Sequence, residues 1–514
     1  MVAAACAPEL PTVTTPPSVA GATDFETTIV RLEARDPGSP ETLNARLQYA
    51  DFLSGSDSGD CHKRLDMAQA QLDAVGQRPA LQVLLPHGRA KLDSGAYKIH
   101  TARADCDPSL RRVELQKALE AAREAVSHYR DGLDYQSAAI MQFNAAATEH
   151  ALGDQAAAIS ALEAAIAMDR DFGFRDDAED NIRLLRHWRG EDESDAAIAA
   201  LMKDFPARKA EVKFHWSSTD ADVEVNVDDT SMIHGEIVRS RGSVGLKRHV
   251  RAVSTGWKVS NEAGKSSYEL GHWPADTTKL QWSAMYFMAR ALLQAPTIDI
   301  GKDGDFRSVG SPQAFGKTLA TEISTQISAQ VGEITSDAPP RSADAVMRDL
   351  SPAFSREFID YSAMQDYGIE TGTWIGAKLE QGVWYQMSTP LFLPGLGLGH
   401  YIVQYDVNFA FTRQVPCKAE SPDRLCAEIV IHATPHADAL KAAIEEAGRQ
   451  IKIPDKQSMY GWSVTDLRLV VDPDTLLPHI CDTRQYYYGA IEGAAQKSDS
   501  LIESIRTVST SVYH

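Results

Sequence analysis

Residues 134–171 read DYQSAAIMQFNAAATEHALGDQAAAISALEAAIAMDRD, and their pattern indicates the structure of the N-terminal part of the chain. Its apolar residues recur three and four positions apart, which is the spacing of one face of an α-helix. The triplet Leu152-Gly153-Asp154 interrupts the pattern, and Gly153 can adopt a turn conformation that a side chain would penalise. The stretch therefore predicts two helices joined by a tight turn. The first helix carries Ile140, Phe143, Ala146 and Ala147, and the second carries Ala158, Leu162, Ala165 and Ile166.

Two looser helical pairs precede this unit. Residues 42–54 are expected to pair with 64–75, and 79–92 with 109–129, with longer loops at 55–61 and 93–108. The small residues and the short turn of 134–171 resemble a tetratricopeptide repeat, and three hairpins are enough for a stable stack of such units. The resemblance implies an array over residues 24–190 that binds a protein or peptide partner. A generic bundle of the same hairpins is the alternative.

The cysteines form two candidate pairs. Cys61 and Cys106 fall in the two long loops, and equivalent loops of neighbouring repeats lie on the same edge of a stack. The repeat resemblance therefore implies a disulfide between them. Cys417 and Cys426 flank a Ser-Pro-Asp turn signal between strand-like runs, where cross-strand cysteines can meet disulfide geometry. Two unrelated thiols are the alternative for the second pair, and Cys481 would be left unpaired.

The periodicity changes near residue 208. An acidic linker and a short helix occupy 191–208, and the region 209–514 alternates apolar and polar residues as half-buried strands do. Runs of strands interrupted by helices predict a multidomain chain, with an all-α helical hairpin array followed by an α+β domain with a largely antiparallel sheet. We expect strands at 211–216, 223–227, 237–259, 402–412, 428–432, 463–471, 483–488 and 504–512, and helices at 277–294, 312–331, 342–367 and 437–452.

The first residues of the sequence indicate the cellular compartment of the protein. Three alanines precede Cys6, and a tract rich in proline and threonine follows it. This resembles the end of a bacterial lipoprotein signal, although no basic or apolar region stands before it. The resemblance implies that Cys6 is acylated, that residues 1–23 hold a flexible tether, and that the protein is periplasmic or anchored in the outer membrane. Paired cysteines agree with an oxidising envelope compartment. An unmodified Cys6 in a disordered tail is the alternative.

No motif indicates catalysis. A GxSxG nucleophile elbow is absent, and Pro435 prevents His432 and His436 from sharing a helical turn as a zinc-binding HExxH motif requires. We therefore predict no catalytic residue, no metal site and no cofactor. The segment PLFLPGLGLGH at 390–400 is expected to be an apolar glycine loop or bulged strand between aromatic strands. If it forms the lip of a pocket, its candidate ligand-binding residues are Phe392, Leu396, Leu398 and His400.

The composition excludes some partners. Lys and Arg total 51 against 71 Asp and Glu, and the net charge of −20 disfavours nucleic acid and anionic membrane surfaces. The membrane is expected to be reached only through a lipid on Cys6. The first functional hypothesis is a non-enzymatic envelope protein whose helical arm binds a protein partner. The second is a periplasmic carrier that holds a lipid-like or apolar ligand in the region 209–514, and a hydrolytic enzyme is the least favoured.

Overall fold

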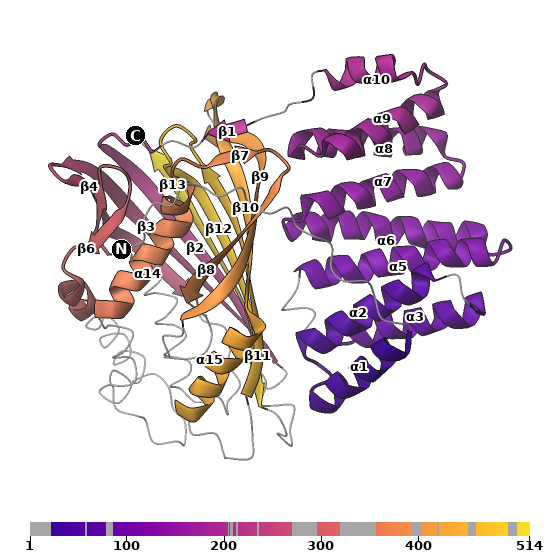
Figure 1. The fold of residues 1–514 in the computed structure, drawn as a ribbon, viewed down its shortest axis with the longest axis horizontal. Helices are drawn as coiled ribbons and strands as arrows, with labels where there is room; N and C mark the ends of the chain where they lie inside the picture. Colours follow the sequence, from indigo (N-terminus) through magenta and orange to yellow (C-terminus); the bar gives the residue numbers. More distant parts are fainter. Residues whose placement is uncertain are drawn as a thin grey trace.

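The computed structural model describes residues 22–56, 59–78, 86–203, 205, 209–211, 214–233, 236–269, 296–318, 356–392, 402–418, 421–450, 459–491 and 501–514. An array of helices is followed by a large antiparallel sheet, which confirms the expected fold class. The array lies along one face of the sheet, and the helices α14 (Arg356–Glu370) and α15 (Ala437–Gln450) lie on the other face (Figure 1).

The helical array continues from α1 to α10, and each helix packs against its neighbours in the chain. Its small residues are at the contacts, because Ala146, Ala158 and Ala165 are completely buried where α7 meets α8 and their neighbours. The helices are α1 (Ala22–Arg35), α2 (Pro40–Gly55), α3 (Cys61–Gly76), α5 (Pro86–Cys106), α6 (Arg111–Asp131), α7 (Tyr135–Ala151), α8 (Gln155–Phe172), α9 (Arg175–Arg189) and α10 (Asp195–Met202).

The hairpin of α7 and α8 forms as its sequence predicts. Asp134 caps α7 by accepting a hydrogen bond from the backbone N of Ser137 at 3.0 Å, and Asp154 caps α8 in the same way from Ala157 at 3.1 Å. The turn between the two helices contains Gly153 with a φ of +85°. The two caps and the glycine set where each helix begins and ends.

The expected loop at 93–108 is wrong, because α5 remains helical to Cys106. Ile99 and Ala104 are fully buried. Because many polar residues surround them in the sequence, the spacing of apolar residues does not reveal this helix. Gly95 lets α5 approach α3 closely, since a Cβ at this position would lie 3.1 Å from Leu72 Cδ2. Residues 79–85 of the expected helix 79–92 lie outside the described residues.

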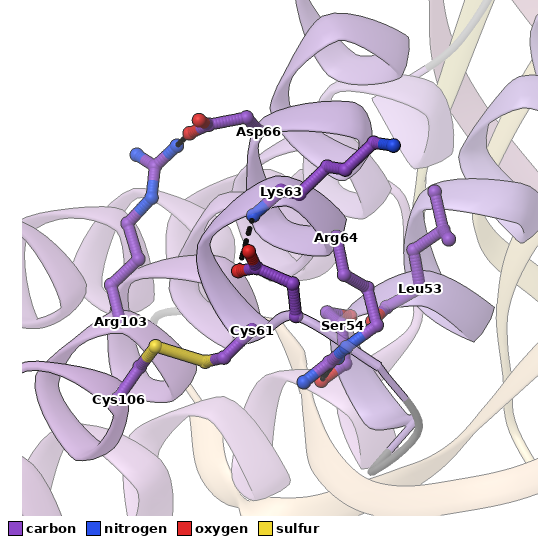
Figure 2. The surroundings of a disulfide bond; sticks show 9 residues. Leu53, Ser54, Cys61, Lys63, Arg64, Asp66, Arg103 and Cys106 are labelled. Atoms are coloured by element: carbon purple, nitrogen blue, oxygen red, sulfur yellow. Dashed lines mark hydrogen bonds and ion pairs between the residues drawn. A yellow bond between two sulfur atoms is a disulfide. The ribbon is translucent and has the colours of Figure 1, made fainter.

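Cys61 and Cys106 form the expected disulfide, but neither residue is in a loop. Cys61 is the first residue of α3 and Cys106 is the last residue of α5, and their Cα atoms are 6.3 Å apart. Figure 2 shows the bond beside a second link between the same two helices, the ion pair of Arg103 with Asp66 at 3.0 Å. The disulfide thus joins two helix ends that already pack together.

The main sheet has eleven strands in the order β6-β5-β4-β3-β2-β13-β12-β11-β10-β9-β8, and every neighbouring pair is antiparallel. A separate small pair joins β1 to β7. The strands are β1 (Lys209–Glu211), β2 (Thr219–Ile233), β3 (Glu236–Val253), β4 (Gly256–Glu269), β5 (Ile298–Gly301), β6 (Phe306–Val309), β7 (Lys378–Glu380), β8 (Trp384–Phe392), β9 (Ile402–Lys418), β10 (Ser421–Pro435), β11 (Met459–Val471), β12 (Pro478–Ile491) and β13 (Leu501–Tyr513).

The strands differ from expectation in several places, and β5, β6 and β7 were not expected. Residues 237–259 form the hairpin of β3 and β4 rather than one strand, with a turn that ends at Gly256. At 211–216, strand structure ends at Glu211 and residues 214–216 are irregular. The helix expected at 277–294 lies outside the described residues, as do 319–331 and 342–355 of two others.

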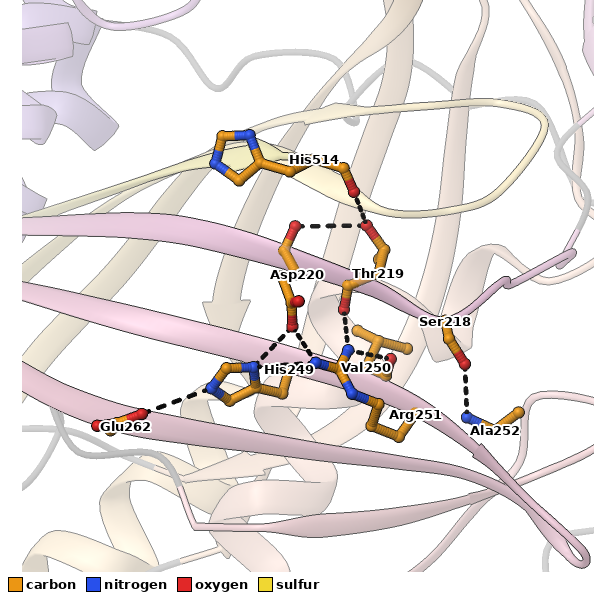
Figure 3. A network of polar contacts seen from close by, with 9 residues as sticks. All are labelled: Ser218, Thr219, Asp220, His249, Val250, Arg251, Ala252, Glu262 and His514. Carbon is orange, nitrogen blue, oxygen red and sulfur yellow. Dashed lines mark hydrogen bonds and ion pairs between the residues drawn. The ribbon is translucent and has the colours of Figure 1, made fainter.

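The last residue of the chain ties β13 to β2 (Figure 3). The backbone N of His514 donates to the carbonyl oxygen of Asp220 at 2.8 Å, and Thr219 Oγ1 donates to the carbonyl oxygen of His514 at 2.8 Å. The Asp220 carboxylate in turn binds His249 Nδ1 of β3 at 2.7 Å and pairs with Arg251. These contacts therefore join two neighbouring strands in the middle of the sheet, and not at its edge.

Candidate ligand-binding site

A cavity of about 260 Å³ lies between α14 and the face of the sheet that is turned away from the helical array. Its floor is formed by alternate residues of the central strands, because side chains point to opposite faces of a sheet with a period of two. Its wall residues include Val225, Leu246, Arg248, Val250, Val259, Asn261, Leu391, Tyr405, Thr465, Leu467, Cys481, Thr483, Gln485, Thr507, Ser509 and Tyr513 of the sheet and Asp366, Tyr367, Ile369 and Glu370 of α14.

Because of the same alternation, the residues between those that line the cavity point toward the helical array. On β12, Cys481, Thr483 and Gln485 line the cavity, whereas Tyr486 and Tyr488 pack among apolar residues of α1, α2, α3 and α5. The sheet is therefore covered on both faces in its central part. This explains why its central strands carry apolar or paired residues on both sides.

Four polar side chains from β3, β4 and α14 line the same cavity, namely Arg248, Asn261, Asp366 and Glu370. Arg248 Nη1 lies 3.8 Å from Glu370 Oε2, and Arg248 Nε donates to Asn261 Oδ1 at 3.2 Å. Asp366 retains accessible surface although protein surrounds it, because its side chain faces the cavity. Burial, together with the charge of Glu370, raises the pKa of Asp366 to about 7. The carboxyl group therefore changes its charge near neutral pH.

Aromatic rings form one wall of the cavity. Trp216 is 7% exposed and makes edge contacts with Trp257, at 6.2 Å between centroids, and with Tyr367, at 6.3 Å. Tyr367 donates a hydrogen bond from its hydroxyl to the carbonyl oxygen of Gly304 at 2.6 Å. The indole Nε1 of Trp216 has no hydrogen-bond partner among the described residues. A buried N–H without a partner costs free energy unless a water or a ligand accepts its hydrogen bond.

The residues proposed from the glycine-rich segment are only partly described. Phe392 is the last residue of β8 and pairs with Ile402 of β9, while Leu396, Leu398 and His400 lie outside the described residues. Leu391, the neighbour of Phe392, lines the cavity. Phe392 itself is not among the residues that line the cavity, so the proposed ligand-binding residues stay a prediction. The sequence missed the polar residues of the cavity, since these come from strands and a helix that are far apart in the chain.

The remaining cysteines have separate roles. Cys417 and Cys426 form the second expected disulfide, which joins β9 to β10 with 4.9 Å between the Cα atoms. Cys481 is free, as expected, and burial in the cavity wall raises the pKa of its thiol, so that it is a poor nucleophile at neutral pH. Cys6 lies outside the described residues.

Comparison with known proteins gives no family for this chain. No protein-family profile matches it, and no curated protein is significantly similar to it. A solved structure described as lipid–protein interactions in lipovitellin aligns over 58% of this chain and 25% of its own, with 10% identity and a TM-score of 0.26. The chain thus spans about a quarter of that protein, and a TM-score of this size does not indicate a common fold. In the part of the chain that is described, no helix is both long and apolar enough to cross a bilayer.

Proposed function

We propose that the protein binds a small amphiphilic ligand, with an apolar body and a polar head, in the cavity between the sheet and α14. This proposal rests on one observation, which is that the cavity combines apolar walls with a cluster of polar groups. The cluster consists of Arg248, Asp366 and Glu370. Ligand sites in proteins are commonly concave, mostly apolar, and equipped with a few polar groups that orient the ligand. A cavity of about 260 Å³ is near the lower end of the usual range for such sites, so the ligand is small.

Each part of the cavity has a role in this binding. Burial against Val225, Leu246 and Leu467 stabilises an apolar chain by about 25 cal/mol per Å² of surface removed from water. Arg248 supplies a cationic donor for an anionic or carbonyl head group. The Nε1 of Trp216 supplies a further donor that the protein itself leaves without a partner among the described residues.

The test measures binding of decanoic acid and decanol to the full-length protein by isothermal titration calorimetry. Mass spectrometry of an organic extract of the natively purified protein accompanies it. A saturable signal near one ligand per chain is expected. Ser509→Phe places a large ring in the cavity, whereas Thr510→Phe, at the next position of β13, is exposed on the opposite face. The first variant should lose binding and the second should retain it. Absence of binding and of extracted ligand, or equal binding by both variants, contradicts the proposal.

Binding of a protein partner by the helical array remains a prediction from its repeat resemblance. One face of the array packs against its own sheet, where residues of α1, α2, α3 and α5 contact Met232, Tyr486 and Tyr488. A partner must therefore use a different face. The large apolar residues exposed on the array lie on α1, at the start of α6, on α7 and on α10: Val30, Leu110, Val113, Ile140 and Leu201.

An envelope location also stays part of the proposal. The two disulfides are the kind of bond that persists in an oxidising compartment outside the cytoplasm. Acylation of Cys6 is a separate prediction. Intact mass measurement of the native product tests it, because an unmodified Cys6 would exclude a lipid anchor at this position.

A further inference from the structure

Two histidines and an aspartate meet where the helical array touches the sheet, on the face opposite the cavity. His87 belongs to α5, His432 to β10 and Asp466 to β11. His87 Nε2 lies 3.1 Å from Asp466 Oδ2, and His432 Nδ1 lies 2.7 Å from Asp466 Oδ1. His87 and Asp466 are 379 residues apart in the chain. The cluster is therefore built by docking of the array on the sheet.

The three side chains are held in position by their surroundings. Asp466 is 1% exposed, so its carboxylate cannot turn toward bulk water. The ring of His432 stacks on Trp384 at 5.3 Å and meets the edge of His87 at 5.5 Å. The ring of His87 covers Gly132, where a Cβ would lie 3.2 Å from His87 Cε1 and Nδ1. Both imidazoles thus point at the carboxylate in fixed orientations.

This arrangement has the donors and the spacing of a transition-metal site. The ligand atoms of His87, His432 and Asp466 all lie within 4.8 Å of one another. One zinc ion bound at about 2.0–2.2 Å from nitrogen and oxygen can reach ligand atoms about 3–4 Å apart. Two imidazoles and one carboxylate favour zinc, cobalt or nickel over calcium and magnesium, which prefer oxygen ligands.

We propose that His87, His432 and Asp466 bind one divalent transition metal ion, of the zinc class, which links the helical array to the sheet. Three protein ligands leave a position for water, as in open zinc sites. Because the ion bridges α5 to β10 and β11, it stabilises the docked arrangement by binding only when the array and the sheet are together. The other described cluster of this kind, Cys417, Cys426 and His479, is not available, because its two cysteines form a disulfide.

The test uses untagged full-length protein stripped with a chelator and then dialysed. Titration with zinc sulfate should show one ion per chain with micromolar or tighter affinity, and a rise of the thermal midpoint by a few degrees at saturation. The cobalt(II) form should show the absorption bands of a four- or five-coordinate site, with paramagnetically shifted imidazole N–H signals in the NMR spectrum. These spectra identify imidazole ligands without any substitution.

Variants separate this cluster from other histidines of the chain. His87→Gln and His432→Gln should each weaken zinc binding at least tenfold and abolish the cobalt bands. His128→Gln is the matched control, because His128 Nδ1 also binds a carboxylate, Asp93 Oδ2 at 2.6 Å, but without a second imidazole. It should leave zinc affinity unchanged. No zinc binding at 100 μM by the wild type, equal affinity in His432→Gln and wild type, or a cobalt spectrum without imidazole signals would overturn the proposal. Asp466 would then simply accept hydrogen bonds from two imidazoles.

Discussion

Gln381 Nε2 donates a hydrogen bond to the carbonyl oxygen of Asp171 at 2.6 Å, and so connects the end of α8 to the sheet. The same nitrogen donates to the carbonyl oxygen of Thr412 at 3.0 Å. Two glycines allow this approach, since a Cβ on Gly173 would lie 2.8 Å from Gln381 Cγ and a Cβ on Gly382 would lie 2.8 Å from the carbonyl oxygen of Gly173. The array and the sheet thus meet here backbone to backbone.

Gly173→Ala should destabilise this contact strongly. Gly173 has a φ of +82°, which an alanine adopts only at a cost of about 1 kcal/mol, and the added Cβ also collides with Gln381. We expect the free energy of unfolding, measured with urea, to fall by roughly 2–4 kcal/mol. Backbone amides at the contact should also exchange their hydrogens faster.

The matched control is Gly153→Ala. Gly153 has a φ of +85°, but a Cβ there has nothing within 4 Å. Gly153→Ala therefore introduces only the backbone strain. It should lower the free energy of unfolding by only about 1 kcal/mol. If the two variants lose equal stability, the close approach of Gly173 and Gln381 contributes nothing.

The two disulfides should stabilise the chain unequally. Cys61 and Cys106 are 45 residues apart, whereas Cys417 and Cys426 are 9 apart, and a longer closed loop restricts the unfolded chain more. Replacing Cys61 and Cys106 by serine should lower the free energy of unfolding by about 2–5 kcal/mol. Replacing Cys417 and Cys426 should lower it by less. Thermal unfolding of both double variants under non-reducing conditions compares them. A larger loss for the Cys417–Cys426 variant would contradict this order.

Asp169 should make the helical array less stable as the pH rises. It is 1% exposed and accepts a hydrogen bond from Asn181 Nδ2 at 2.8 Å. Burial raises its pKa to about 7 from a usual value near 4, so the folded protein binds a proton that the unfolded chain has lost between these values. Stability from this group is thus present at pH 4 and is lost as the pH passes through 7.

Asp169→Asn removes the buried charge but keeps an oxygen that can accept from Asn181. At pH 8 the variant should be more stable than wild type by on the order of 2–4 kcal/mol, because one pKa unit corresponds to about 1.4 kcal/mol. At pH 4 the two proteins should be similar. Asp171→Asn, at an exposed position of the same helix, is the control and should change neither value. Parallel pH profiles for Asp169→Asn and wild type would refute the expectation.

Ligand binding in the cavity should depend on the charge of Asp366. Its pKa of about 7 means that the carboxyl group is neutral at pH 6 and negative at pH 8. A carboxylate ligand such as decanoate should therefore bind more weakly at pH 8, by roughly three- to tenfold, because it would meet a like charge. Asp366→Asn should remove most of this pH dependence, and decanol should show little of it in either protein. Retention of the full pH dependence in the variant would assign it to another group.

The amino-acid sequence determined the local structure, because helices and strands depend on spacings of three to four or two residues. Residues 134–171 form the predicted hairpin, and the strand at 402–412 lies within β9. The pair Cys417–Cys426 followed from a local turn signal. The pair Cys61–Cys106 was implied by the repeat resemblance, although the two residues lie at helix ends and not in loops. The polar stretch 93–106 shows the limit of periodicity, since its helix is held by contacts with α3 and α6.

The positions of the candidate sites depend on the tertiary structure. Arg248 of β3 and Cys481 of β12 share a cavity because alternation places both side chains on one face of the sheet, and α14 brings Asp366 to the same cavity. His432 has no partner that its sequence neighbourhood reveals, because His87 reaches it only when the array docks on the sheet. Secondary structure reflects short-range spacing along the chain. Sites formed between distant segments depend on how those segments pack, and packing depends on the shape of all the side chains at the contact.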